Sequence, residues 1–276
     1  QITENMKPCI LITGATAGIG LATAELLHTK GCKVFASGRN RDKLTELNST
    51  GLSAVYLDVT HVDSCRDALA EIQSQGFWVQ TLINNAGYGQ FGAFEDIDDA
   101  TARAQFDTNV FGLSNITRLV IPAMRENHSG RIVNLSSIAG KVSMPVGGWY
   151  AASKFAIEAL SDAMRWELKD FGIKVVIIEP GPIKSEFGKT ANRMIEKLNS
   201  KGYYDKFYGF VRNFDSQFNI GGTSEHGAKI IVRAATVRRP CIRYRVTAAA
   251  KLIYAMRLML CDRLFDAGMM KYFKHS

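Results

Sequence analysis

The clearest chemical signal in the sequence is a tyrosine and a lysine four positions apart, Tyr150 and Lys154. Residues at i and i+4 share a helix face, so the Lys154 ammonium can approach the Tyr150 hydroxyl. A nearby positive charge favours the phenolate, and we expect it to lower the pKa of Tyr150 from its ordinary value of about 10. A phenol tuned in this way can act as a general acid or base.

Two serines, Ser136 and Ser137, end an apolar segment 13 residues before Tyr150. A serine hydroxyl opposite the tyrosine can hydrogen-bond to a substrate oxygen. A Tyr-x-x-x-Lys spacing by itself is more often part of an ordinary surface. The pair indicates a site because a second motif accompanies it.

That motif is a glycine-rich turn, TGATAGIG, over residues 13–20. It follows a short apolar run and precedes a segment with helical spacing. Glycine permits a tight turn and the close approach of a diphosphate, and a helix N-terminus supplies N–H groups for the anion. Between the first strand and first helix of a βαβ unit this pattern is specific, and a tight turn without a ligand is the alternative.

The end of the second expected strand carries basic residues, Gly38-Arg39-Asn40-Arg41. Proteins that prefer NAD usually place an acid there to hold the ribose hydroxyls. Arg39 can instead bind a 2′-phosphate with its guanidinium fork. The sequence therefore favours NADP(H) over NAD(H), and solvated surface charges are the alternative for both arginines.

Alternating strands and helices must position these residues. We predict strands over 7–13, 33–37, 54–57, 81–84, 131–135, 174–178 and 241–246. We predict helices over 19–30, 41–48, 62–75, 100–127, 149–171 and 223–236, with Pro122 bending or interrupting the fourth. The alternation is typical of an α/β fold, here a single-domain, doubly wound parallel sheet of the Rossmann type over 1–276.

Residues 184–222 break this alternation. Eight aromatic residues fall within the 32 positions from Phe187 to Phe218, which is 25%, against 10% for the chain: Phe187, Tyr203, Tyr204, Phe207, Tyr208, Phe210, Phe214 and Phe218. Long connections of this kind are usually lids or binding loops, so we predict an aromatic substrate lid. Ordinary packing or a subunit contact is the alternative.

Most of the positive charge lies near the C-terminus. The chain has 34 basic and 26 acidic residues, and residues 229–276 hold 11 of the former and 2 of the latter. A nucleic-acid binder would more often spread its charge over a recognition element, so we expect no nucleic-acid partner. Residues 247–276 form a basic extension with helical spacing. It can pack on the protein's own body, close over the pocket, form a subunit contact or lie on an anionic membrane.

Five cysteines, none in a CxxC pair, argue against a disulfide framework or a zinc site, and we expect no metal. No uncharged apolar run reaches 18 residues, so no transmembrane helix is expected. No leader of a signal peptide is visible. We expect a cytoplasmic protein, with peripheral contact to a membrane surface as one role of the extension.

Together these motifs resemble the short-chain dehydrogenase/reductase superfamily, in its main branch of one-domain subunits, over roughly residues 7–246. The matching residues, in family order, are Thr13, Gly14, Gly18, Ile19, Gly20, Asp58, Val59, Asn84, Asn85, Ala86, Gly87, Asn109, Ser137, Tyr150, Ser153, Lys154, Pro180, Gly181, Pro182 and Ile183. The segments 147–150, 179–183 and 242–244 look similar to the group of estradiol-type hydroxysteroid dehydrogenases, retinol dehydrogenases, acyl-dihydroxyacetone-phosphate reductases and NADP-dependent aldehyde reductases.

The resemblance implies roles for particular residues. Tyr150 would protonate a carbonyl oxygen, Ser137 would polarise it, Lys154 would hold the nicotinamide ribose, and Asn109 would hold a water of the proton relay. The expected cofactor site comprises Thr13, Gly14, Thr16, Ala17, Gly18, Ile19, Gly20, Arg39, Asp58, Val59, Asn85, Ala86, Gly87, Lys154, Pro180, Gly181, Ile183 and Ser185, with Ser185 in place of the family's usual threonine.

The expected activity is NADP(H)-dependent hydride transfer to or from the carbonyl or alcohol of a lipophilic aldehyde, ketone, steroid or retinoid-like substrate. Two alternatives stay open: a 3-oxoacyl thioester reductase and a non-catalytic NADP(H) sensor. The family resemblance also implies a homodimer or homotetramer.

Overall fold

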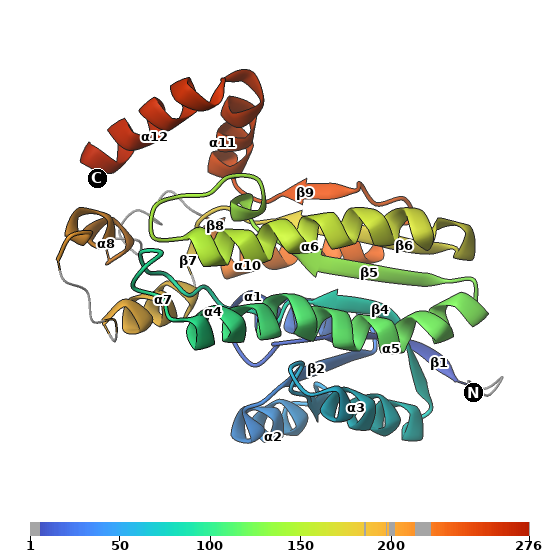
Figure 1. Ribbon diagram of the computed structural model, residues 1–276. Coiled ribbons are helices and arrows are strands. Elements are labelled where there is room, and N and C mark those ends of the chain that lie inside the picture. Colours follow the sequence, from blue (N-terminus) through green and yellow to red (C-terminus); the bar gives the residue numbers. More distant parts are fainter. Residues whose placement is uncertain (1–5, 185, 197, 199–201, 213–221, 276) are drawn as a thin grey trace.

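A parallel seven-stranded sheet runs through the computed structural model, which describes residues 6–184, 186–196, 198, 202–212 and 222–275 (Figure 1). The strands are β1 (Lys7–Ile12), β2 (Val34–Gly38), β3 (Ala54–Tyr56), β4 (Phe77–Asn84), β5 (Gly130–Leu135), β6 (Ile173–Glu179) and β9 (Arg243–Arg245). Their spatial order is β3-β2-β1-β4-β5-β6-β9. The order reverses between β1 and β4, and ligands of such sheets bind in the crevice beyond the strand ends at this point.

Helices cover both faces of the sheet, as Figure 1 shows. They are α1 (Gly18–Thr29), α2 (Arg41–Ser49), α3 (Val62–Ser74), α4 (Asp99–Phe106), α5 (Leu113–Glu126), α6 (Gly148–Glu167) and α10 (Ser224–Thr236). On one face, Leu27 of α1 and Ile231 of α10 pack over Ile12. On the other, Ile72 of α3 and Ile116 of α5 pack over Leu11. These two cores confirm the doubly wound α/β prediction.

Strand β4 begins four residues earlier than expected. Phe77 pairs with Lys7, and Val79 with Cys9, after which the register shifts so that Ile10 pairs with Thr81. Gln80 is the extra residue at this irregularity, and its side chain donates a 2.9 Å hydrogen bond to Ser129 Oγ. A polar residue at a bulge interrupts the apolar pattern, which is why the sequence located only the second half of the strand.

The expected helix over 100–127 spans 99–126, but its middle turn, Asp107–Gly112, is a π-helix. Pro122 lies inside α5, which runs on to Glu126, so the predicted interruption at the proline is wrong, whereas a bend there stays a prediction. Helix α6 ends at Glu167 and is followed by a short 3₁₀ turn. Gly172, with φ of +69°, then leads into β6.

The segment predicted as a lid contains two helices in its described part, α7 (Glu186–Glu196) and α8 (Asp205–Arg212). Strands β7 (Ile183–Lys184) and β8 (Gly222–Thr223) pair in parallel at its two ends. Ser185, Phe214 and Phe218 lie outside the described residues.

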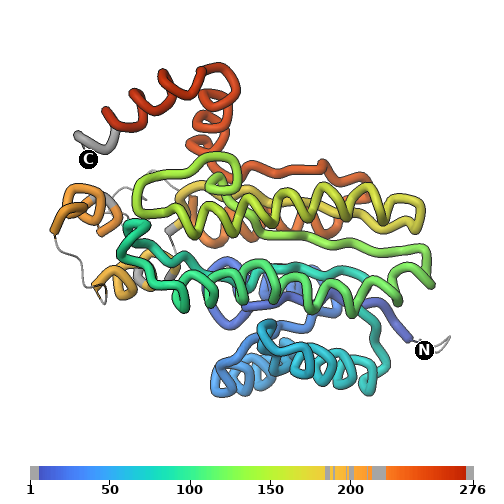
Figure 2. Tube along the Cα trace, viewed as in Figure 1, coloured from blue at the N-terminus to red at the C-terminus, as the bar shows by residue number. Residues whose placement is uncertain are grey.

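The C-terminal extension forms a hairpin of two helices, α11 (Ala248–Met259) and α12 (Asp262–His275), which projects from the body beyond β9 (Figure 2). Thr247 caps α11 by accepting a hydrogen bond from Ala250 N–H. The expected continuous helical spacing over 247–273 is therefore divided at residues 260–261. Within the described ranges, no helix has the length and apolar character to cross a membrane.

Candidate functional site

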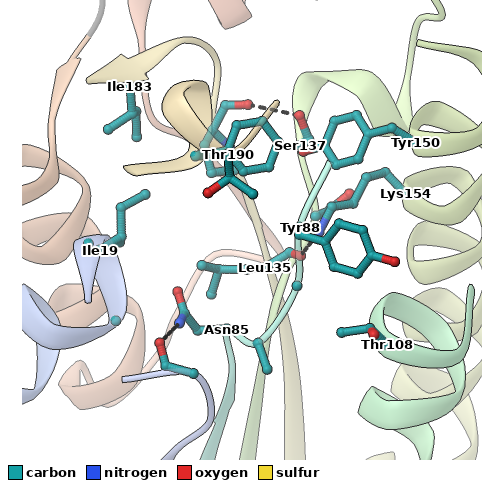
Figure 3. A pocket seen from close by; sticks show the side chains of 18 of the residues that line it. Ile19, Asn85, Tyr88, Thr108, Leu135, Ser137, Tyr150, Lys154, Ile183 and Thr190 are labelled. Carbon is teal, nitrogen blue, oxygen red and sulfur yellow. Dashed lines mark hydrogen bonds between the residues drawn. The ribbon is translucent and has the colours of Figure 1, made fainter. Parts of the chain in front are cut away.

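A cavity of about 560 Å³ lies beyond the carboxyl ends of β1, β4, β5 and β6 (Figure 3). Most of the expected site residues line it: Gly14, Thr16, Ala17, Gly18, Ile19, Gly20, Arg39, Asp58, Val59, Asn85, Ala86, Gly87, Ser137, Tyr150, Lys154, Pro180, Gly181 and Ile183. Thr13 and Asn109 are not among the lining residues, and Ser185 is outside the described part of the chain. The sheet thus brings together residues from seven separate segments.

The glycine-rich turn forms a close-packed cradle. Gly14 has φ of +65°, and a Cβ at this position would lie 2.8 Å from Ala86 Cα. A Cβ on Gly20 would lie 2.6 Å from Gly14 O and would also overlap Asn85 Nδ2. Helix α1 starts here without a side-chain cap and without an acid in its first turn. Its N-terminal N–H groups can therefore face an anion such as a diphosphate.

Thr13 supports the cradle from behind. Its buried Oγ1 accepts hydrogen bonds from Asn85 N–H (3.1 Å) and Ala86 N–H (3.0 Å). Asn85 Nδ2 returns hydrogen bonds of 2.9 Å to Thr13 O and Gly14 O. Thr13 therefore positions the loops that follow β1 and β4. Thr13 is not among the residues that line the cavity, and its direct contact with a cofactor stays a prediction.

A basic side chain stands at the far end of the cavity. Arg39 Nη1 lies 3.9 Å from Asp58 Oδ2, and the Arg39 side chain is 70% exposed. Burial opposes ionisation of Asp58. Hydrogen bonds from Thr60 and the Arg39 and His61 charges outweigh burial and hold the pKa of Asp58 below its ordinary value. The exposed guanidinium keeps donors for a further anionic group.

Tyr150 and Ser137 form the polar centre of the opposite wall. Both side chains line the cavity, and Ser137 Oγ accepts from Ala139 N–H (3.1 Å) and donates weakly to Pro180 O (3.4 Å). The Tyr150 ring packs between Phe91 and Phe187, each with a centroid distance of 5.5 Å. The two side chains thus share one wall of the cavity with an aromatic cluster.

Lys154 reaches into the same wall from one helical turn further along α6, as Figure 3 shows. Its Nζ donates a 2.9 Å hydrogen bond to Leu135 O and lies 5.7 Å from the Tyr150 ring centroid. Burial lowers the pKa of Lys154 to about 8, while Glu158 opposes the change. Burial also raises the pKa of Tyr150 to about 12, against the opposing hydrogen bond from Ser137. The expected lowering of the Tyr150 pKa is therefore wrong, because burial disfavours the phenolate more strongly than the Ser137 side chain stabilises it.

Asn109 lies in the π-helical turn, where it is buried. Its Oδ1 accepts from Tyr88 N–H (3.1 Å), and its Nδ2 donates to Tyr88 O and Ser153 Oγ (3.0 Å each). The side chain joins the loop after β4 to α6 beside Lys154. Its role in a proton relay stays a prediction, although π-helical turns often occur at functional sites.

Several lining residues were not found from the sequence. They are Gly38, Asn40, Leu57, Thr60, Tyr88, Phe91, Thr108, Leu135, Ser136, Ile138, Ala139, Met144, Gly147, Ala151, Pro182, Phe187 and Thr190. The sequence had singled out Gly38, Asn40, Ser136, Gly147, Pro182 and Phe187, but had assigned none of them to the catalytic or cofactor site. Phe91 and Met144 lie in loops without periodicity, and Thr190 lies on α7. Their place in the cavity depends on packing between distant segments.

Known proteins resemble this chain along most of its length. The family model for short chain dehydrogenases matches residues 8–196. The probable short-chain type dehydrogenase/reductase VdlC of Helicobacter pylori is 34% identical over 93% of this chain and 94% of its own. A 3-ketodihydrosphingosine reductase of Bacteroides thetaiotaomicron is 34% identical over 91% and 92%. The closed form of a serine dehydrogenase complexed with NADP+ has a TM-score of 0.76 and 26% identity, covering 86% of this chain and 93% of that one.

Proposed function

The chain belongs to the short-chain dehydrogenase family, and we propose that it acts as an NADP(H)-dependent oxidoreductase on lipophilic carbonyl or alcohol substrates, with Tyr150 as general acid/base. The observation that carries this proposal is that Tyr150, Ser137 and Lys154 line the same cavity as the glycine-rich cradle, beside an aromatic pocket. The particular subgroup near the hydroxysteroid and retinol dehydrogenases stays a prediction.

The proton step follows from the hydroxyl geometry. A pKa of about 12 keeps Tyr150 protonated at neutral pH, so it enters carbonyl reduction as an acid. Proton transfer to an alkoxide-like oxygen is downhill, because an alkoxide is a stronger base than a phenolate. Ser137, oriented by Ala139 N–H, hydrogen-bonds to the same oxygen and stabilises its developing charge. The protonated form of Tyr150 is the form that the reduction step requires.

The cradle and Arg39 fit a nicotinamide dinucleotide with a 2′-phosphate. The N-terminus of α1 and the approach permitted by Gly14 and Gly20 would hold the diphosphate. Arg39 would pair with the 2′-phosphate, and the buried Lys154 would hold the nicotinamide ribose. When bound, such a cofactor supplies the hydride for reduction or accepts it in oxidation. The NADP+ bound to the similar serine dehydrogenase supports this choice.

The substrate end of the cavity supports a lipophilic carbonyl. Phe91, Met144 and Phe187 line it, and the polar Thr190 lies among them. Apolar side chains with few polar groups are typical of pockets for lipophilic ligands. The similarity to a 3-ketodihydrosphingosine reductase points in the same direction.

Assembly and location belong to the proposal as well. Phe155, Leu160 and Trp166 of α6 are exposed to 45%, 41% and 75%, and Phe111 of the neighbouring π-helical turn to 56%. Exposed apolar residues gathered on two adjacent elements favour a contact between copies, as a homodimer or homotetramer. A cytoplasmic enzyme with peripheral membrane contact through its basic extension fits the charge distribution.

The test is NADPH consumption with lipophilic aldehydes, ketosteroids, retinal and long-chain 3-keto lipids, using Tyr150→Phe as the matched variant. We expect turnover by the wild type, and NADPH binding without turnover by the variant. Full turnover by Tyr150→Phe would refute the assigned acid. Activity confined to acetoacetyl thioesters would favour the thioester reductase, and NADPH binding without turnover of any carbonyl would favour the sensor.

A further inference from the structure

Helix α11 carries apolar side chains both on the face that packs against the body and on the opposite, exposed face. Ala250 and the partly buried Ile253 and Tyr254 pack against Ile138 and Val142 of the body. The opposite face, which includes positions 251, 252, 255, 258 and 259, carries three exposed apolar side chains. Leu252, Leu258 and Met259 are exposed to 62%, 68% and 75%. An ordinary surface helix would present polar residues on this side.

Helix α12 repeats the arrangement. Phe265 is buried and Met269 packs beside it, whereas Leu264 and Met270 are exposed to 61% and 38%. By helical spacing, Leu264 and Met270 share the outer face with Arg263 and Lys271, and all four side chains are exposed. The outer surface of the hairpin therefore mixes large apolar side chains with cations.

The charge on this surface is mainly positive. Lys251, Arg263 and Lys271 are exposed, while Asp262 is held by Arg257 in a 2.8 Å ion pair. Asp266 is the remaining acid of the hairpin and is also exposed. Long basic side chains can extend their charge to a lipid headgroup while their methylene stems lie along apolar surface.

The hairpin also lies against the wall of the substrate cavity. Met269 packs against the cluster that contains Phe91, Phe187 and Tyr150, which line the cavity. Helix α12 contacts α8 of the segment predicted as a lid, and the two helices lie near each other in Figures 1 and 2. A surface that binds the hairpin would therefore lie beside the substrate end of the site.

We propose that the outer face of the α11–α12 hairpin, formed by Lys251, Leu252, Leu258, Met259, Arg263, Leu264, Met270 and Lys271, docks on an anionic lipid membrane and thereby brings the cavity to a membrane-resident substrate. Anionic headgroups neutralise the cations while the apolar side chains enter the interface. A second copy meeting this face about a two-fold axis would bring like charges together. The docking develops the peripheral membrane contact of the proposed function and does not depend on the proposed chemistry, whereas the delivery of substrate rests on that chemistry.

Docking is tested by co-sedimentation of the full chain with vesicles. We expect binding to phosphatidylcholine vesicles that contain phosphatidylserine, little binding to phosphatidylcholine alone, and release at high salt. The triple variant Lys251→Glu, Arg263→Glu and Lys271→Glu should lower the partition coefficient by roughly a hundredfold or more, since each cation near such a surface contributes about a fivefold factor. Leu258→Ser with Met259→Ser should weaken binding without altering charge.

The matched control is Lys30→Glu, Lys43→Glu and Lys169→Glu, three exposed positions away from the hairpin with the same change in net charge. It should bind vesicles nearly as well as the wild type. An equal loss in the control would attribute the binding to net charge and overturn the proposal. If the wild type does not bind anionic vesicles, and the Leu258→Ser, Met259→Ser variant has a lower oligomer mass, the outer face of the hairpin would instead be a contact between two copies.

Substrate delivery has its own measurement. The hairpin triple variant should reduce a water-soluble aldehyde at the wild-type rate, but a long-chain ketone embedded in anionic vesicles at least tenfold more slowly. Equal rates on the embedded ketone would overturn delivery while leaving docking intact. Absence of turnover on both substrates by the wild type, with vesicle binding retained, would instead count against the proposed function.

Discussion

The Lys154 ammonium donates its 2.9 Å hydrogen bond to the backbone oxygen of Leu135, the last residue of β5. This bond fixes the lysine at the edge of the sheet, beside the cavity and 5.7 Å from the Tyr150 ring centroid. Because one polar acceptor replaces bulk water around a buried cation, the charged form of Lys154 is disfavoured. The stability of the fold should therefore depend on the protonation of this lysine.

Replacing Lys154 with methionine should change how stability depends on pH. Burial lowers the Lys154 pKa from 10.5 to about 8, so between these values the unfolded chain binds a proton that the folded chain does not. Stability contributed by this group therefore rises with pH in that window. Between pH 8 and pH 10 the wild type should gain about 2–3 kcal/mol relative to Lys154→Met, from about 1.4 kcal/mol for each pH unit.

Urea unfolding at a series of pH values measures this difference. The contributions of the other titrating groups cancel in the difference between the two proteins, since both contain them. Tyr150 changes the stability of either protein only from about pH 10 upwards, because its folded-state pKa is raised from 10 to about 12. Parallel stability curves for the two proteins would show that Lys154 keeps an ordinary pKa in the fold.

Arg39 should determine the choice between NADPH and NADH. Its exposed guanidinium lines the cavity next to the ionised Asp58. Arg39→Ala should raise the Kd for NADPH by about 10- to 100-fold, because it removes a hydrogen bond to a charged group. The Kd for NADH should not change. Arg39→Asp should reverse the preference. Arg41, which stacks 4.2 Å from the Tyr56 ring, provides the control. A loss confined to Arg41→Ala would transfer the role to that residue.

The sequence located the elements whose signals are local. The helix after the glycine-rich turn and strand β2 were placed to within one residue, because hydrophobic spacing and flanking glycines mark both. The cradle was found for the same reason, since Gly14 and Gly20 occur at a strand–helix junction. The local sequence of these elements is therefore sufficient to predict them.

Features that depend on distant packing were not predictable. The π-helical turn at Asn109 and the bulge at Gln80 reflect contacts with other segments. Met144 and Thr190 reach the cavity only through the fold of their loops and helices. The pKa of Tyr150 was expected in the wrong direction, because i,i+4 spacing gives proximity to Lys154 but no information about desolvation.

Gly14→Ala should abolish dinucleotide binding, because the added Cβ would lie 2.8 Å from Ala86 Cα and would force the cradle apart. Gly31 offers a matched control. It also has a left-handed backbone, with φ of +77°, but a Cβ there meets nothing within 4 Å. Both variants should lose about 1–2 kcal/mol of stability from backbone strain, and only Gly14→Ala should lose NADPH binding in a fluorescence titration. Similar affinities for both would show that the cradle tolerates a side chain.

Tyr208→Phe should loosen the segment predicted as a lid. The Tyr208 side chain is 1% exposed, and its hydroxyl donates to Asp96 Oδ2 (2.6 Å) and accepts from Ala93 N–H (2.8 Å). Phenylalanine keeps the ring but leaves both partners unsatisfied, at a cost of about 1–3 kcal/mol in the free energy of unfolding. Tyr204→Phe, which removes a 2.7 Å hydrogen bond to Glu95 from an exposed pair, should cost less than about 1 kcal/mol.

Tyr208 also packs with Phe91 and Phe187, which line the substrate end of the cavity. We therefore expect Tyr208→Phe to raise KM for bulky lipophilic carbonyls and to leave kcat for a small aldehyde unchanged. Unchanged KM values for both substrate sizes would show that α8 does not shape the substrate pocket.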